Sequence, residues 1–511
     1  MIIYWHKRDM RLIDNQALNL AMDLAVKNSL SLMPIMGLET DLIKSDKTNY
    51  EFSDFTQFGL LSAMLPLYMN YKHFGLEPIL FCEPILDILH KIEAINSIRY
   101  LVTHQEHGTD GTFDRDKSVH EFCQKYSIDW YQIAPSGVVR NLESRDLRAK
   151  IVKEYLNAKI IPMPNFGKIK QTQISKSFDW EGIFDKLTDL KNLIGSKHNL
   201  QECSEKQGLN TLESFAIQRA SGYRGGISSP NSALSSGSRL SQFLAYGSLS
   251  LRYIHQYFWT NIKSTDDNKL KSGMLAATQR LHWREHFIQR LEIDPNMPDH
   301  SINPDFDQIQ YSHNLELFQR YQIGTTGEVL IDACMRCLNS TGFINFRMRA
   351  MLVSYGIFGL DLDWRELGKF LATVFLDYEP GIHWSQIQMQ AGVTGINTIR
   401  VYSPHKQLLD QDSECIFVRK WIPELVNLSN EQILDYPNIS LSKLTNGKYP
   451  DPIVNFKTAC KLNKAKTFGI RKLSSKEVAK KVFIKHGSRK KKRIVKKLVV
   501  KKIHFELGLF D

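Results

Sequence analysis

The sequence predicts an α/β domain with a doubly wound parallel sheet, followed by an all-α domain. Short apolar runs alternate with helical patterns over about the first 132 residues, and helical patterns alone fill most of the chain from Glu213 to about residue 435. A chain of 511 residues is long enough for several domains, and strands that alternate with helices are typical of a parallel sheet. We therefore expect four segments: 1–132 (α/β), 133–205 (connector), 206–479 (helical) and 480–511 (basic tail).

Five runs have the length and composition of buried strands: 2–5, 31–36, 78–82, 98–102 and 128–133. The segments between them show helical spacing, for example over residues 17–24. No Gly-x-Gly-x-x-Gly follows the first run, so the usual dinucleotide fingerprint is not predicted. A ligand can still bind where parallel strands end.

The second half predicts helices at 238–259, 327–359 and 364–378, where apolar residues recur at helical spacing. The connector at 133–205 is punctuated by Pro, Lys and Asn, and its periodicity is weaker. We expect it to be largely a long link between the two domains.

The positive charge of the chain is concentrated in one place. The net charge is +12, and residues 480–502 contain 12 Lys or Arg and no Asp or Glu. Without these twelve, 54 basic residues balance 54 acidic ones. Such a block either binds a nucleic acid through its phosphates or is simply a solvated tail, and the sequence leaves both open.

The cysteines and the hydropathy indicate the compartment. Seven scattered cysteines are too few and too irregular for a disulfide framework, so we expect a reducing, cytoplasmic environment. No run of about 18 apolar residues and no signal peptide are evident, so no membrane association is expected. Cys334 and Cys337 form a Cys-x-x-Cys pair on a predicted helix, and we interpret them as core residues and expect no metal site.

The stretch SGYRGGISSPNSALSSGSRLSQFLAYGSLSL at 221–251 is rich in Gly and Ser but runs directly into a helical pattern. Ser235, Ser236 and Ser238 are good N-cap residues, and Arg239 lies beside them. A capped helix start with an arginine is a ready anion site. We therefore interpret this stretch as a loop that holds a phosphate group and not as a tether.

Several motifs together resemble the photolyase/cryptochrome family of flavoproteins. They are WHKRDMRLIDNQAL, YRGGISSPNSALSSGSRLSQFLAYGSLSLR, LHWREHF, TGEVLIDACMRCLNSTGFINFRMRAML, DLDWRELGKFL, VYSPHKQ, VRKWIPEL and YPDPIV. They follow the order and the spacing of that family over about residues 1–460. The resemblance implies an N-terminal antenna domain and a C-terminal helical domain that binds FAD in a folded conformation.

The resemblance also implies which side chains hold the FAD. They are Tyr223, Gly237, Ser238, Arg239, Leu240, Ser241, Arg280, Arg284, Arg347, Arg349, Asp377, Glu379 and His383. Hydroxyls, backbone N–H groups and a guanidinium suit a diphosphate. Either Arg347 or Arg349 is expected to pair with Asp377, and such a pair beside the isoalloxazine ring stabilises a reduced, anionic flavin.

The same resemblance implies a pocket for a pyrimidine dimer. Trp283 matches the tryptophan that stacks against a flipped-out pyrimidine dimer. Contacts to DNA are expected from Arg224, Arg280, Trp283, Phe346 and Met389. UV-damaged DNA is therefore the expected partner, and the basic tail at 480–502 would add attraction to phosphates.

The chain departs from the dimer-repairing pattern at several positions. Arg280 stands where the pocket of the family usually has Glu, and Phe346 stands where it has Asn. A second pocket Trp falls near Met389, and the Asn that faces flavin N5 falls at or near His383. These changes leave the type of lesion open, although a histidine could donate a proton.

The tryptophan chain for electron transfer is also altered. Trp364 keeps the middle position of this chain, but Ile387 stands at the flavin-proximal position. Trp384 is the candidate that substitutes for the missing proximal tryptophan. With Trp283 and His383, these two tryptophans are the expected catalytic residues.

Two functions follow from the resemblance. The first is a light-driven DNA photolyase that uses photoexcited reduced FAD, and the alternative is a cryptochrome-type blue-light photoreceptor without repair. Glu106, in THQEHGTDGTFDRD, is the expected contact of a second, antenna chromophore, either folate or deazaflavin. We expect a monomer.

Overall fold

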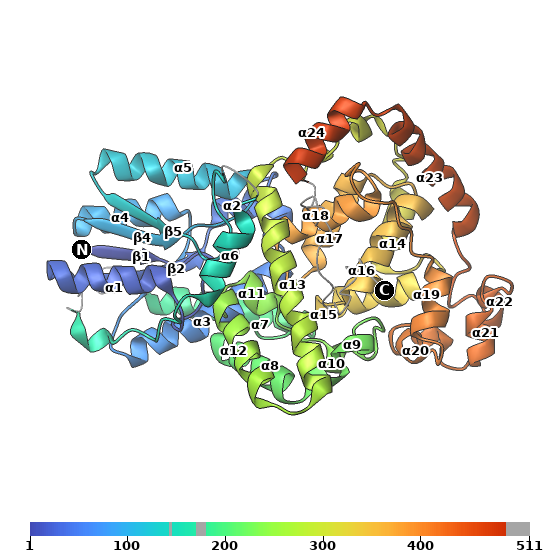
Figure 1. The fold of residues 1–511 in the computed structure, drawn as a ribbon. Helices are drawn as coiled ribbons and strands as arrows, with labels where there is room; N and C mark the ends of the chain where they lie inside the picture. The colour runs from blue at the N-terminus through green and yellow to red at the C-terminus, as the bar shows by residue number, and fades with distance from the viewer. Residues whose placement is uncertain (143–145, 170–179, 487–511) are drawn as a thin grey trace, which may run out of the picture.

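The computed structural model describes residues 1–142, 146–169 and 180–486. An α/β domain and a helical domain lie side by side, and α13 (Asn268–Ile293) runs along the boundary between them (Figure 1). The predicted fold class is therefore confirmed. Most of the basic tail, from residue 487 on, lies outside the described residues.

The sheet has five parallel strands in the order β3-β2-β1-β4-β5. The strands are β1 (Ile2–Trp5), β2 (Leu32–Leu38), β3 (Ile79–Cys82), β4 (Tyr100–His104) and β5 (Asp129–Ile133). All five predicted strands are confirmed, with bounds that differ by two residues at most. The order reverses at the central β1, which pairs with both β2 and β4, so a switch point lies at its carboxyl end.

Helices cover both faces of the sheet, as period-2 alternation requires. Ile2 and Tyr4 point into a core formed with α1 and α3, whereas Ile3 and Trp5 pack with α4 and α5. The helical segments of this half are α1 (Gln16–Asn28), α2 (Thr40–Lys44), η1 (Asn49–Phe52), α3 (Asp54–His73), α4 (Ile85–Ile95), α5 (Asp110–Lys125), α6 (Arg148–Asn157), η2 (Phe166–Lys168) and α7 (Trp180–Lys197).

The connector contains more regular structure than its sequence suggested. It holds α6 and α7, and α7 packs against α3 and β3 of the α/β domain. The polar punctuation hid these helices because only one stripe of each is buried, for example Val152 and Leu156 in α6.

The rest of the described chain is helical, as predicted. It comprises α8 (Glu205–Ile217), η4 (Arg219–Gly222), α9 (Tyr223–Gly226), α10 (Ala233–Ser236), α11 (Ser241–Ala245), α12 (Leu251–Ser264), α13, η5 (Pro304–Gln308), α14 (Leu315–Ile323), α15 (Val329–Thr341), α16 (Phe346–Ser354), η6 (Tyr355–Gly359), α17 (Trp364–Val374), α18 (Pro380–Ala391), α19 (Pro404–Gln411), α20 (Ile416–Trp421), η7 (Pro423–Leu425), α21 (Asn430–Leu434), α22 (Leu441–Leu444), α23 (Phe456–Leu473) and α24 (Lys476–His486).

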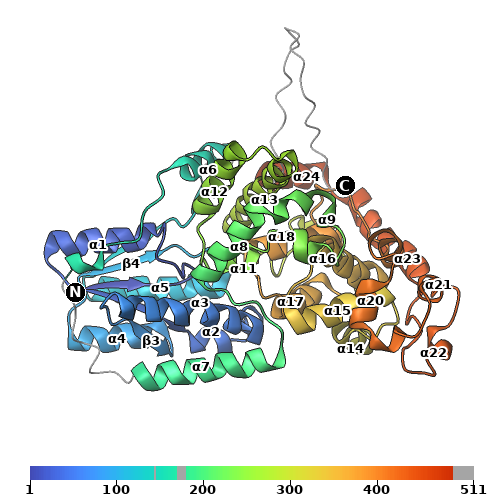
Figure 2. The same cartoon turned by 90° about the horizontal axis from the view of Figure 1, so that it is seen from below.

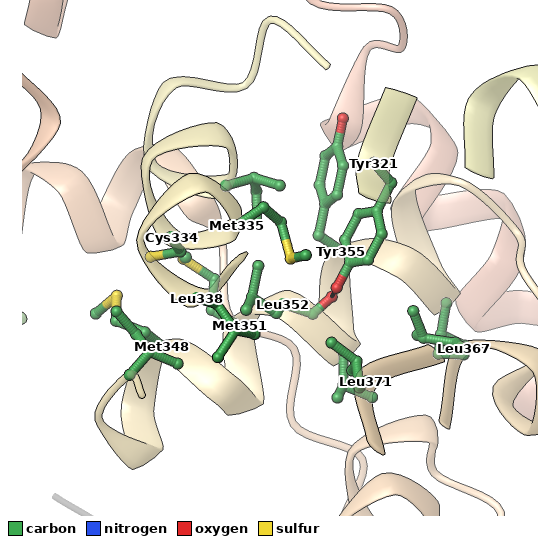
Figure 3. Close-up of a cluster of buried hydrophobic side chains, with 14 of the residues drawn as sticks. Tyr321, Cys334, Met335, Leu338, Met348, Met351, Leu352, Tyr355, Leu367 and Leu371 are labelled. Carbon is green, nitrogen blue, oxygen red and sulfur yellow. Dashed lines mark hydrogen bonds between the residues drawn. The ribbon is translucent and has the colours of Figure 1, made fainter. Parts of the chain in front are cut away.

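A large core fixes α15, α16 and α17 together. Figure 3 shows methionine and leucine side chains of these helices around Tyr321 and Tyr355. Cys334 and Cys337 lie in this region and are almost completely buried, which confirms their interpretation as core residues. Across the described part of the chain, no group of His, Cys, Asp or Glu side chains is arranged to hold a metal ion.

Buried polar contacts join the two domains. Asp14 accepts hydrogen bonds from Ser250 and Arg252 of the helical half, and Glu205 accepts from the backbone N–H groups of Leu12 and Ile13 at 3.1 and 2.9 Å. Such partners are costly to separate because each buried charge would lose its compensation. In the stretches that the structure describes, no helix is long and apolar enough to span a bilayer.

Candidate functional site

The Gly- and Ser-rich stretch is a compact loop built from three short helices, α9, α10 and α11. One expectation about it is wrong: no serine caps α11. Arg239 adopts a left-handed backbone conformation (φ 57°), and Leu240, two residues after Ser238, takes the N-cap position. Because α11 has only five residues, its dipole is weak. The case for an anion site therefore depends on side chains.

Arg219, which the sequence interpretation missed, holds this loop in shape. Its guanidinium donates to the carbonyl oxygens of Gly237, Ser238 (3.3 Å) and Thr211 (2.8 Å). Gly237 is needed for the tight path, since a Cβ there would lie 2.5 Å from the carbonyl oxygen of Ala233. An arginine four residues before the expected Tyr223 was the only signal of this role.

Arg239 projects from the loop into the interior of the helical domain. Its guanidinium lies 3.7 Å from the centre of the Phe343 ring, and Nη2 donates to Gln201 at 2.6 Å. Nη1 is buried and has no hydrogen-bond partner. Burial lowers the pKa of Arg239 to about 10, so the side chain is still a cation at neutral pH but is incompletely compensated.

Asp377 is the point at which the predicted flavin residues converge. Arg349 forms a two-pronged ion pair with it, at 2.9 and 3.0 Å, and the Ser241 hydroxyl also donates to it. Burial alone would raise the pKa of Asp377, but Arg349, Ser241 and Arg239 together lower it below its ordinary value. The predicted Arg–Asp377 pair is confirmed for Arg349, whereas Arg347 lies 3.5 Å from Gln407.

These residues fit a dinucleotide that carries negative charge. Arg239, Arg349 and Asp377 together bear one uncompensated positive charge, and the free Nη1 of Arg239 is a donor without an acceptor. Ser241 is exposed, and its hydroxyl donates to the largely buried carboxylate of Asp377. Asn345, with a buried and unpaired Oδ1, joins the loop to α16 by donating to the carbonyl of Ser228 at 2.8 Å.

His383 stands on α18, six residues after Asp377. Its Nε2–H donates to the carbonyl oxygen of Gly368 at 2.8 Å, and its ring contacts those of Phe375 and Tyr378. Burial lowers the pKa of His383 to about 4. The imidazole is therefore neutral at physiological pH, so a role as a positively charged proton donor is disfavoured.

The two candidate redox tryptophans are in contact. The ring centres of Trp364 and Trp384 lie 6.2 Å apart, and Trp384 also contacts His383 at 5.2 Å. Both indoles are completely buried. Gly368 makes room for this arrangement, because a Cβ there would overlap the Trp384 ring.

An unforeseen carboxyl group lies close to this pair. Glu51, from the α/β domain, accepts a hydrogen bond from the Tyr378 hydroxyl at 3.1 Å, and neighbouring Tyr50 contacts Trp384 at 6.0 Å. Burial raises the pKa of Glu51 to about 7. No motif in the sequence pointed to Glu51, because its partner is 327 positions away.

The predicted DNA-contact residues are accessible to different degrees. Arg224, Arg280 and Phe346 are exposed, whereas Trp283 and Met389 are half-buried. Arg280 lies over the Trp283 ring at 4.3 Å and also hydrogen-bonds to the hydroxyl of Tyr223. Arg280 therefore joins the expected stacking tryptophan to the Ser-rich loop.

A cavity lies between the two domains, and Glu106 is part of its wall. Both carboxylate oxygens of Glu106 are already paired, with Arg115 at 2.8 Å and Arg8 at 3.4 Å. Arg284 and Glu379 form an ion pair at 2.7 Å and line this cavity too. These two predicted flavin residues thus lie at the domain boundary.

The fold and the site together define a two-domain protein whose helical half has an arginine-rich cluster suited to an anionic dinucleotide. Residues 2–145 match the family described as DNA photolyase, and residues 277–468 match the FAD binding domain of DNA photolyase. Together these matches span more than half of the chain. The protein belongs to the photolyase/cryptochrome family of flavoproteins.

Individual relatives agree with this assignment. The chain is 24% identical over 477 residues to a deoxyribodipyrimidine photo-lyase of Buchnera aphidicola, which covers 89% of this chain and 94% of that protein. It is 31% identical to a tomato (Solanum lycopersicum) cryptochrome DASH, over only 38% of this chain and 33% of that protein. A class III photolyase structure from Agrobacterium tumefaciens has the same fold, with a TM-score of 0.76 at 20% identity over 92% of this chain and 98% of that one.

Proposed function

We propose that this protein is a light-driven DNA repair enzyme, a DNA photolyase, which splits UV-induced pyrimidine photoproducts. Reduced FAD, when bound and excited by light, supplies the electron for this reaction. The observation that carries the proposal is the convergence of Arg239, Arg349, Ser241 and Asp377 in the helical domain. The photo-lyase names of its relatives, over nearly the full length of the chain, support the repair function.

In this proposal the residues of the chain bind the FAD and orient the extruded base. Arg239 and the backbone N–H of Ser238 hold the diphosphate, whereas the N–H of Gly237 already donates to Ala233, and the Arg349–Asp377 pair faces the ring system. Trp283 stacks against the extruded base, and the guanidinium of Arg280 holds the indole ring of Trp283 in place. His383, Trp364 and Trp384 form the aromatic wall behind this site.

The proposal extends to a second chromophore, and to the compartment, oligomeric state and partner of the protein. We place a folate or deazaflavin antenna at the interdomain cavity, where it would contact His107 and Ser136, since Glu106 is already engaged by arginines. Release of the chromophores by denaturation, followed by absorption spectroscopy, would identify them. We further propose a cytoplasmic monomer that acts on UV-damaged DNA.

A repair assay tests the function directly. Protein with reduced flavin is incubated with one oligonucleotide that contains a cyclobutane dimer and another that contains a six–four photoproduct, in blue light and in darkness. Repair of either lesion in blue light but not in darkness would establish the function and identify the lesion. If neither is restored while the flavin is still photoreduced, the chain is instead a photoreceptor of the cryptochrome type.

A further inference from the structure

The last two described helices form a strongly basic surface. Residues 456–486 contain ten Lys or Arg but a single acidic residue, Glu477. Ion pairs with carboxylates involve only Lys466, Lys481 and Lys485 within this described region. Six other basic side chains are exposed and have no carboxylate partner among the residues that the structure describes: Lys457, Lys461, Arg471, Lys472, Lys476 and Lys480.

This surface is fixed to the rest of the protein by a buried contact that we call the α24 clasp, formed by His486, Asp294 and Arg290. His486 Nε2 lies 3.1 Å from Asp294 Oδ2, and Lys485 Nζ lies 3.2 Å from the same oxygen. Arg290 donates to the carbonyl oxygen of His486 at 3.3 Å, and its Nε and Nη1 have no partner among the described residues. His486 is only 3% exposed, so the end of α24 is part of the packed structure.

The clasp lies on the same side of α13 as the expected lesion pocket. Arg290 follows Trp283 by seven residues, and residues seven apart share one face of an α-helix. The rise along the axis over seven residues is about 10 Å. Figures 1 and 2 show α24 lying against the C-terminal end of α13. The basic surface therefore begins about two helical turns from Trp283.

We infer that α23 and α24 form a second DNA-backbone surface, which binds the phosphates of the duplex that flanks the lesion held at Trp283. This inference rests on the proposed function and adds a binding surface to it. Exposed cations without a carboxylate partner among the described residues suit the closely spaced phosphates of a duplex. The clasp gives this surface a defined position relative to the pocket.

The test measures how the affinity for undamaged duplex DNA, in darkness, depends on salt. Replacement of Lys472, Lys476 and Lys480 by Ala is expected to lower the slope of log affinity against log salt by about 2.7, at about 0.9 per lost phosphate contact. A matched control removes three exposed lysines of the α/β domain: Lys27, Lys72 and Lys125. Its slope should stay unchanged, although its net charge falls equally.

A second variant tests the clasp separately. Asp294→Asn should loosen α24, which faster hydrogen exchange at 476–486 would report, and should lower the slope in the same direction. The inference is overturned if the triple variant and its control have the same slope, or if the triple variant loses binding to anionic lipid vesicles and not to DNA. Light-dependent repair at saturating DNA should persist in the triple variant, whereas a wild-type protein without any repair would contradict the proposed function instead.

Discussion

Replacement of Trp283 by Ala should selectively weaken the binding of damaged DNA. The indole is half-buried, and Arg280 lies 4.3 Å from its ring centre, so the ring is held for stacking before any base arrives. Stacking of a base on an aromatic side chain contributes about 1–3 kcal/mol, which corresponds to a loss of about 5- to 150-fold in affinity. Trp283→Phe keeps an aromatic face and should lose less. Competition binding in darkness, with dimer-containing and undamaged duplexes of one sequence, measures this effect.

The matched control for this prediction is Trp259, which is 39% exposed on α12 and contacts His255. Trp259→Ala should leave both affinities within about twofold, because phosphate contacts supply non-specific binding. If Trp283→Ala weakened damaged and undamaged duplexes equally, Trp283 would not stack on the lesion. An equal loss in the Trp259 variant would assign the effect to general destabilisation.

Three further predictions concern stability, and urea unfolding measures each. Asp377→Asn should lower the free energy of unfolding by about 2–3 kcal/mol, because it leaves the partly buried Arg349 without its carboxylate partner; a loss below about 1 kcal/mol would contradict this, since that is typical of surface pairs. Gly368→Ala should cost about 1–3 kcal/mol and alter the near-ultraviolet circular dichroism of Trp384, because its Cβ overlaps that ring; an unchanged spectrum would refute it. Burial raises the pKa of Glu51 to about 7 from 4.5, so the folded state binds the proton more tightly than the unfolded state and loses stability as the pH rises through that window. Glu51→Gln should therefore match the wild type near pH 4 and be more stable at pH 8, by up to about 3 kcal/mol, whereas an equal difference at both pH values would show that ionisation of Glu51 is not the cause.

The sheet and most helices could be predicted from the sequence because their signal is local. The central strand is a continuous apolar run, Ile2–Trp5, and helices of the second half such as α17 bury one clear stripe. α6 and α7 were missed because their apolar stripes are narrow and lie between polar residues. Burial against a distant partner, and not local pattern, decides such segments.

The site was only partly predictable for the same reason. Arg349 and Asp377 lie in motifs whose order indicated their pairing, and the structure confirms it. The positive φ of Arg239, which moved the start of α11, depends on long-range packing against Phe343. Glu51 reaches Tyr378 only after the two domains have docked, so no window of sequence contains that information.

The contacts between Asp14 and Arg252, and between Glu205 and the backbone of Leu12 and Ile13, have a consequence for the melting of the protein. Separation of the two halves would break these contacts together, so we expect the halves to unfold as one unit. Calorimetry should accordingly record one endotherm for the whole molecule. Chromophores bound in the two halves would keep a constant separation and orientation up to that temperature, and the efficiency of energy transfer between them would not depend on slow domain motion.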